Sequence, residues 1–97
     1  MYKVAYNSTY GGWSLCDYHI EWLREKGLDE ETIEAMDLGY YELRCHPLLI
    51  ECLEHFPQSS DISLYEVGDG FGYCIFEYDG AETVITNHPK NFIFNTH

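Results

Sequence analysis

The spacing of hydrophobic residues changes once along the chain, from helical spacing in the first part to a period of two in the second. Residues 2–6 alternate weakly and predict a short strand. Three stretches with helical spacing follow, and glycine or proline ends each of them: about 17–26, 28–38 and 47–56. The segment 40–44, between the second and third of these stretches, is expected to be extended.

Strands are predicted for the second part, because hydrophobic residues recur there at every second position. They cover 62–67, 72–78 and 82–86, and Asp79-Gly80 predicts a tight hairpin between the last two. The predicted order is β-α-α-α-β-β-β. This is an α+β fold in which a small antiparallel or mixed sheet of about four strands packs on two to three helices. A chain of this length has room for one core, so 1–97 is expected to be a single domain, with 87–97 as an extended tail or an extra edge strand.

Residues suited to capping precede the predicted helices. Asp29 can cap the second helix, and Ser14 followed by Asp17 resembles a capping box for the first. Pro47 suits the first turn of the third helix. Histidine is a weak capping residue, so we expect no cap from His46.

The net charge of the chain excludes some classes of binding partner. The formal net charge is −12, and Lys and Arg are absent between Cys45 and Pro89. A field of this sign repels phosphate groups, so neither direct nucleic-acid binding nor attachment to an anionic membrane is expected. No hydrophobic run approaches the roughly 20 residues that span a bilayer, and the first residues lack a signal-peptide pattern. We therefore expect a cytoplasmic protein.

The acidity itself has two explanations, and the sequence leaves both open. Acidic residues can simply keep a small protein in solution. Alternatively, their carboxylates can imitate nucleic-acid phosphates and occupy the basic groove of another protein. Mimicry requires the charges to lie on one face, whereas the sequence spreads them over every segment.

The candidate catalytic residues are Cys16 and His46. Cys16 lies at a predicted helix start, where a thiol pKa can be lowered, and it forms a nucleophile if it is paired with His19 or His46. The simpler interpretation is a half-buried thiol with unrelated histidines. We therefore favour a protein that is not an enzyme.

Two cysteine–histidine pairs are candidate metal ligands. Cys52 and His55 are three residues apart on a predicted helix, and Cys45 is adjacent to His46. Structural zinc sites usually show two close ligand pairs in recognisable spacing, and these pairs do not match it. No metal and no cofactor is predicted.

The corner between the first strand and the first helix is the main candidate binding site. Its two adjacent glycines permit close approach, its rings can stack on a flat ligand, and its backbone amides attract anions. A cation further along the chain can pair with a phosphate. The candidate ligand-binding residues are Tyr10, Gly11, Gly12, Trp13, Ser14 and Arg44. The alternative is structural: the glycines permit packing, Trp13 fills the core and Arg44 pairs with a carboxylate.

Three motifs follow one another along the chain: Tyr10-Gly11-Gly12-Trp13 after a strand ending in Tyr-Asn, Arg44-Cys45-His46-Pro47, and Glu77-Tyr78-Asp79-Gly80. In this order they resemble a family of small uncharacterised proteins of bacteriophages, prophages and large DNA viruses. The resemblance covers nearly the whole chain except the tail. It implies an accessory protein acting in the cytoplasm of an infected host cell. Cys16 and His46 depart from the family, which has Ser and Asp at these positions.

The leading hypothesis is a non-catalytic binding module that inhibits a host protein or sequesters a small ligand, for example a nucleotide. A small enzyme using Cys16 or a histidine is one alternative, and a structural component of a virus particle is another. Nine tyrosines exceed what a core of this size needs, which favours an interaction surface. Homo-oligomerisation through the aromatic tail, with Phe92 and Phe94, also stays open.

Overall fold

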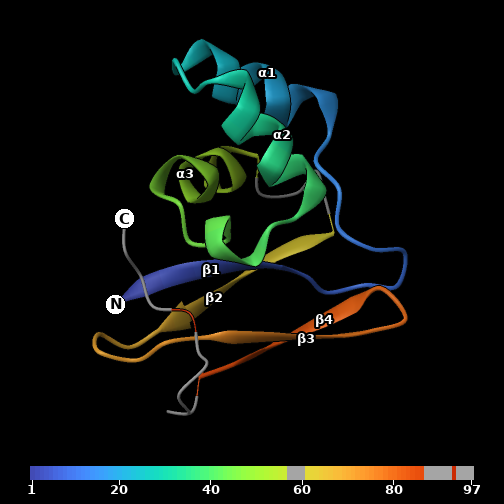
Figure 1. Ribbon diagram of the computed structural model, residues 1–97, viewed down its shortest axis with the longest axis vertical. Helices are drawn as coiled ribbons and strands as arrows, with labels where there is room; N and C mark the ends of the chain where they lie inside the picture. Colours follow the sequence, from blue (N-terminus) through green and yellow to red (C-terminus); the bar gives the residue numbers. More distant parts are fainter. Residues whose placement is uncertain (57–60, 87–92, 94–97) are drawn as a thin grey trace.

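Helices and strands stack in three layers along the longest dimension of the protein (Figure 1). The computed structural model describes residues 1–56, 61–86 and 93. In chain order its elements are β1 (Tyr2–Asn7), α1 (Asp17–Glu25), α2 (Glu30–Leu38), the 3₁₀ helix η1 (Tyr41–Leu43), α3 (Pro47–His55), β2 (Ile62–Val67), β3 (Cys74–Tyr78) and β4 (Ala81–Ile85). The helices form one layer, β1 and β2 the middle layer, and β3 and β4 the third. The predicted α+β class and element order are confirmed.

The strands form two antiparallel pairs rather than one continuous sheet. Tyr2 lies opposite Val67 in the β1–β2 pair, and Cys74 lies opposite Ile85 in the β3–β4 pair. The two strand pairs stay separate because the edge of β1 that faces away from β2 does not pair with another of the described strands. Two backbone amides on this edge donate instead to a loop carbonyl and to a side chain. The Ala5 N–H donates to the Arg44 carbonyl at 2.8 Å, and the Asn7 N–H donates to the Glu82 carboxylate at 2.8 Å.

The middle layer is buried on both faces. Val4 and Ala5 are neighbours in β1, point to opposite faces and are both fully buried. Ala5 packs in a cluster with helix residues such as Leu23 and Leu49, whereas Val4 packs with Ile75 and others from the β3–β4 side. β1 is therefore the central strand of the protein.

Residues 40–44 are not extended, so that prediction is wrong. Gly39 ends α2 with φ +85°, and the chain then turns through η1. The Arg44 N–H donates to the Tyr41 carbonyl at 3.2 Å, and the Tyr73 hydroxyl donates to the same carbonyl. The turn brings Arg44 back to β1, which an extended segment would not do.

Two capping predictions are also wrong, because imidazole nitrogens accept the hydrogen bonds instead. At the start of α1 the residue in the cap position is Cys16, whose N–H donates to His19 Nδ1 at 3.1 Å; Ser14 and Asp17 do not form the predicted box. At the start of α3 the His46 Nδ1 accepts the Leu48 N–H at 3.1 Å. A neutral ring nitrogen lies as close to the backbone as the oxygen of a short polar side chain.

The Asp29 cap is confirmed, with a 3.0 Å bond from the Thr32 N–H. Of the predicted tail, only Ile93 belongs to the described residues. Ile93 forms an isolated bridge with Tyr73, the residue before β3, with N–H···O distances of 2.7 and 2.8 Å. Phe92 and Phe94 lie outside the described residues. No helix within the described ranges is both long and apolar enough to cross a membrane.

Candidate functional site

The glycine corner and the Asp79-Gly80 hairpin, two motifs far apart in sequence, lie against each other (Figure 1). A Cβ atom on Gly80 would lie 2.7 Å from the Gly12 nitrogen and 2.9 Å from the Gly11 nitrogen. Asn7 fixes the contact, since its side-chain amide donates to the Gly80 carbonyl at 2.8 Å. Gly11 and Gly12 have φ values of +121° and +86°, which favour glycine. The corner is therefore shaped to receive the hairpin tip.

Beside this contact lies a cavity of about 300 Å³, which we call the hairpin pocket. It draws its walls from the corner, the α2 end, η1 and the hairpin. The lining residues are Gly12, Trp13, Leu38, Gly39, Tyr41, Arg44, Glu77, Gly80 and Glu82.

Arg44 is 1% exposed and all of its donors bond to the protein. Nε and Nη2 donate to the Gly39 carbonyl at 3.2 and 2.9 Å, and Nη1 donates to the Ala5 carbonyl at 3.3 Å. Nη1 and Nη2 also donate to the two Glu82 oxygens at 2.7 and 2.9 Å. A guanidinium has five N–H groups, so these five bonds leave none for a phosphate. The alternative that Arg44 pairs with a carboxylate is the one that the geometry supports.

Trp13 covers this ion pair. The Arg44 guanidinium carbon lies 3.7 Å from the Trp13 ring centroid, and the Trp13 indole N–H donates to the Met36 carbonyl at 2.7 Å. Gly39 makes room for the ring, because a Cβ there would lie 2.8 Å from Trp13 Cδ1. One face of the indole is thus occupied within the protein.

The structure brings three of the predicted binding residues, Gly12, Trp13 and Arg44, into one pocket. Gly11 supports the hairpin tip, whereas Tyr10 and Ser14 are exposed and do not line the pocket. The lining residues that sequence reasoning missed are Leu38, Gly39, Tyr41, Glu77, Gly80 and Glu82. The Asp79-Gly80 turn predicted the hairpin, and it was the sequence signal that could have pointed to these hairpin residues. No signal distinguished Glu82 from the other acidic residues.

The candidate catalytic residues act as caps in this geometry. His19 Nδ1 accepts the Cys16 backbone N–H, and its Nε2 is buried without a partner among the described residues. Burial lowers the pKa of His19, which keeps the ring neutral. His46 Nδ1 is occupied by the backbone of α3.

The metal candidates do not converge. No group of three or more His, Cys, Asp or Glu suited to a metal ion occurs within the described ranges. Cys52 is buried, and burial raises the pKa of its thiol to about 11. Because a metal ligand is the thiolate, this environment opposes ligation.

His19 predicts a dependence of stability on pH. The pKa of His19 in the folded protein lies below the ordinary value of about 6.5. Between these two pKa values the unfolded chain therefore binds more protons than the folded protein. The free energy of unfolding should fall as pH drops below about 6.5, by up to about 1.4 kcal/mol per pH unit. Urea denaturation from pH 7.5 to 5 measures it.

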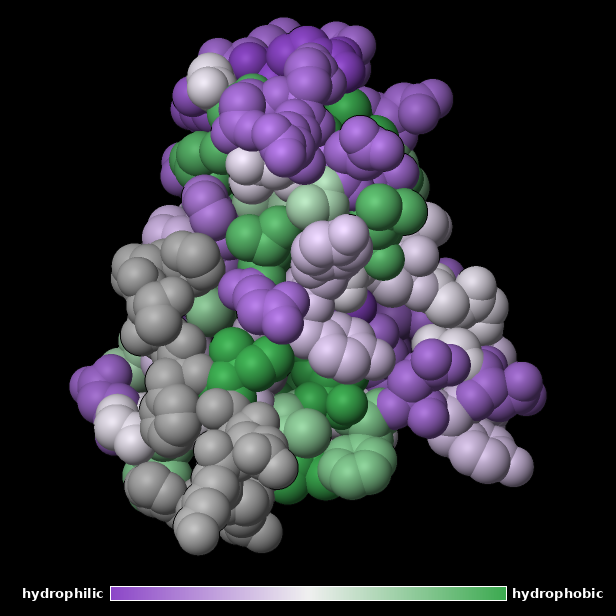
Figure 2. All heavy atoms as spheres, in the orientation of Figure 1, coloured by the Kyte–Doolittle hydropathy of each residue, from purple (hydrophilic) through white to green (hydrophobic). Residues whose placement is uncertain are grey.

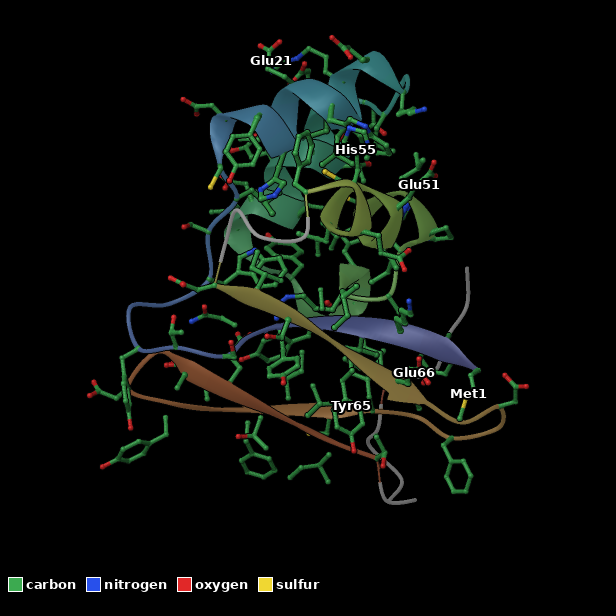
Figure 3. The ribbon with its side chains drawn as sticks, turned by 180° about the vertical axis from the view of Figure 1, so that it is seen from behind. Met1, Glu21, Glu51, His55, Tyr65 and Glu66 are labelled. Atoms are coloured by element: carbon green, nitrogen blue, oxygen red, sulfur yellow. The ribbon has the colours of Figure 1, made fainter. Side chains whose placement is uncertain are left out.

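His19→Asn should flatten this dependence, because the Asn oxygen can replace Nδ1 as the acceptor and does not titrate. The matched control is His55→Asn, on the exposed ring that lies on α3 (Figure 3), and it should retain the wild-type dependence. An unchanged slope in His19→Asn would contradict the assignment.

Comparison with known proteins adds no family. A scan against protein-family models found no match, and searches of curated proteins and of solved structures also found none.

Proposed function

We propose that the chain is a non-catalytic binding module whose partner is a basic protein. Its binding surface is the outer face of the β3–β4 pair, which we call the hairpin face. The observation that carries the proposal is that the described residues of this exposed face carry no charge, in a chain with a net charge of −12.

Strand alternation defines the hairpin face. Ile75, Glu82 and Val84 are buried on the inner side, so the residues between them point outward. The outward residues are Cys74, Phe76, Tyr78, Ala81, Thr83 and Ile85. Phe76 is 61% exposed and Tyr78 is 80% exposed. In the space-filling view hydrophobic residues gather at this end, whereas hydrophilic residues dominate the helical end (Figure 2).

Exposed aromatic rings on an uncharged face are typical of the centre of a protein interface, and charge around them sets the choice of partner. Here the net charge of −12 repels a second copy and attracts a basic surface. An anionic small ligand is disfavoured in the hairpin pocket, since Arg44 has no free donor and Glu77 lies in the wall. The resemblance to phage and viral proteins would make the partner a host protein.

The double variant Phe76→Ser/Tyr78→Ser tests the hairpin face. Proteins captured from a lysate by the wild type are identified, purified and titrated by calorimetry. We expect a basic partner whose Kd rises at least tenfold for the double variant and whose binding weakens as salt is raised.

The matched control is Phe71→Ser, which removes an exposed ring from the turn that precedes β3 and should leave Kd within twofold. An acidic partner, equal binding by the double variant, or a wild-type dimer that the double variant abolishes would each overturn the proposal. Light scattering measures the last of these.

A further inference from the structure

We infer that the hairpin pocket binds the cationic side chain of an arginine or lysine. The inference rests on the proposed function, because the side chain would belong to the basic partner. It gives that partner a defined chemical anchor.

The charges in the pocket favour a cation. Arg44 and Glu82 neutralise each other, which leaves the Glu77 carboxylate. Glu77 lies directly opposite Glu82 in the β3–β4 pair, on the side of the hairpin that faces the pocket. One Glu77 oxygen accepts the Gly80 N–H at 3.3 Å, and no Lys or Arg of the described ranges lies within ion-pair distance of Glu77.

The rings of the pocket favour the same ligand. Tyr41 lines the wall near the carboxylates, and its pKa is raised by burial and further by the charges of Glu82 and Glu77. A cation between a carboxylate and an aromatic ring gains both an ion pair and an attraction to the ring. The Arg44 guanidinium, 5.2 Å from the Tyr41 centroid, already shows this kind of contact within the protein.

Other ligands fit less well. An anion would meet Glu77 and find every Arg44 donor occupied. The cavity of about 300 Å³ is at the lower end of small-molecule pockets, which suits one side chain better than a nucleotide. β3 also connects the pocket with the hairpin face, since Glu77 lies between Phe76 and Tyr78 in sequence.

Ethylguanidinium is the probe that tests the pocket without a partner. It is titrated into ¹⁵N-labelled protein at constant ionic strength, and NMR follows the Trp13 indole N–H and the Gly80 amide. We expect both signals to shift with ethylguanidinium and to reach saturation. With ethyl phosphate, the two signals should shift no more than they do with sodium chloride.

Glu77→Gln should weaken ethylguanidinium binding at least fivefold, and the remaining signals of the spectrum report whether the variant is folded. Glu51→Gln removes the same charge from α3, far from the hairpin tip (Figure 3), and should stay within twofold of wild type. Equal weakening by both variants, no saturable shift in the wild type, or an equal shift with ethyl phosphate would overturn the inference.

The two proposals can fail separately. If ethylguanidinium does not bind but the Phe76→Ser/Tyr78→Ser variant loses its partner, the pocket inference is wrong and the binding module stands. If ethylguanidinium binds through Glu77 but the double variant keeps its partner, the hairpin face is wrong.

Discussion

Replacing Glu82 with glutamine is expected to lower the free energy of unfolding by about 3–5 kcal/mol, the usual cost of breaking a buried ion pair. Arg44 would keep its charge in a site where it is 1% exposed, and a neutral amide cannot compensate for it. The Asn7 N–H would also lose a charged acceptor. Urea denaturation followed by far-ultraviolet circular dichroism measures the change.

Two variants serve as controls for Glu82→Gln. Glu54→Gln removes a carboxylate from the exposed Lys3–Glu54 pair and should destabilise the protein far less than Glu82→Gln, because solvent screens an exposed pair. The double variant Arg44→Met/Glu82→Leu removes both buried charges and should be more stable than Glu82→Gln. A cost for Glu82→Gln no larger than that for Glu54→Gln would show that the pair is not buried in solution.

Gly80→Ala is expected to lower the free energy of unfolding by about 2–5 kcal/mol, the sum of two effects. A residue with a side chain is strained at φ +89°, by about 1–2 kcal/mol. The new methyl group would also meet the Gly12 nitrogen at 2.7 Å, and overpacking typically costs about 1–3 kcal/mol more. The obstacle is backbone, so the corner has to move away from the hairpin.

Gly70→Ala separates the two effects, because Gly70 has φ +84° and nothing lies within 4 Å of its Cβ position. The loss of stability in Gly70→Ala should therefore reflect backbone strain alone. The amides of Gly11 and Gly12 should shift in the NMR spectrum of Gly80→Ala and not in that of Gly70→Ala. Equal costs for the two variants would mean that the corner and the hairpin tip do not touch.

Local chemistry accounts for the features that were predicted correctly. Gly39 ends α2, Asp29 caps it, and Asp79-Gly80 makes a hairpin, each through groups within a few residues of one another. Hydrophobic spacing gave the helices and strands for the same reason, since it reflects which face of one element is buried.

The error at residues 40–44 arose because distant groups decide the local conformation there. Arg44 turns back through η1 because its guanidinium bonds to Glu82 and to the Ala5 carbonyl, from strands far away in sequence. Nothing local marks Glu82 among 17 acidic residues as the partner of Arg44. The sequence therefore predicted only part of the site. It identified the glycine corner and Arg44, but not Glu77 and Glu82, whose carboxylates set the charge of the pocket.

The central strand β1 depends on partners that the ribosome synthesises much later. β1 is made early, yet one of the groups that satisfies its edge, Glu82, follows Asn7 by 75 residues. A ribosome adding about 5–20 residues per second needs about 4–15 s to cover that distance. Until Glu82 is synthesised, the nascent strand has an unsatisfied edge, and an exposed strand edge is prone to pair with other chains. The protein thus depends on its helices, completed first, to cover one face of β1 before the hairpin arrives.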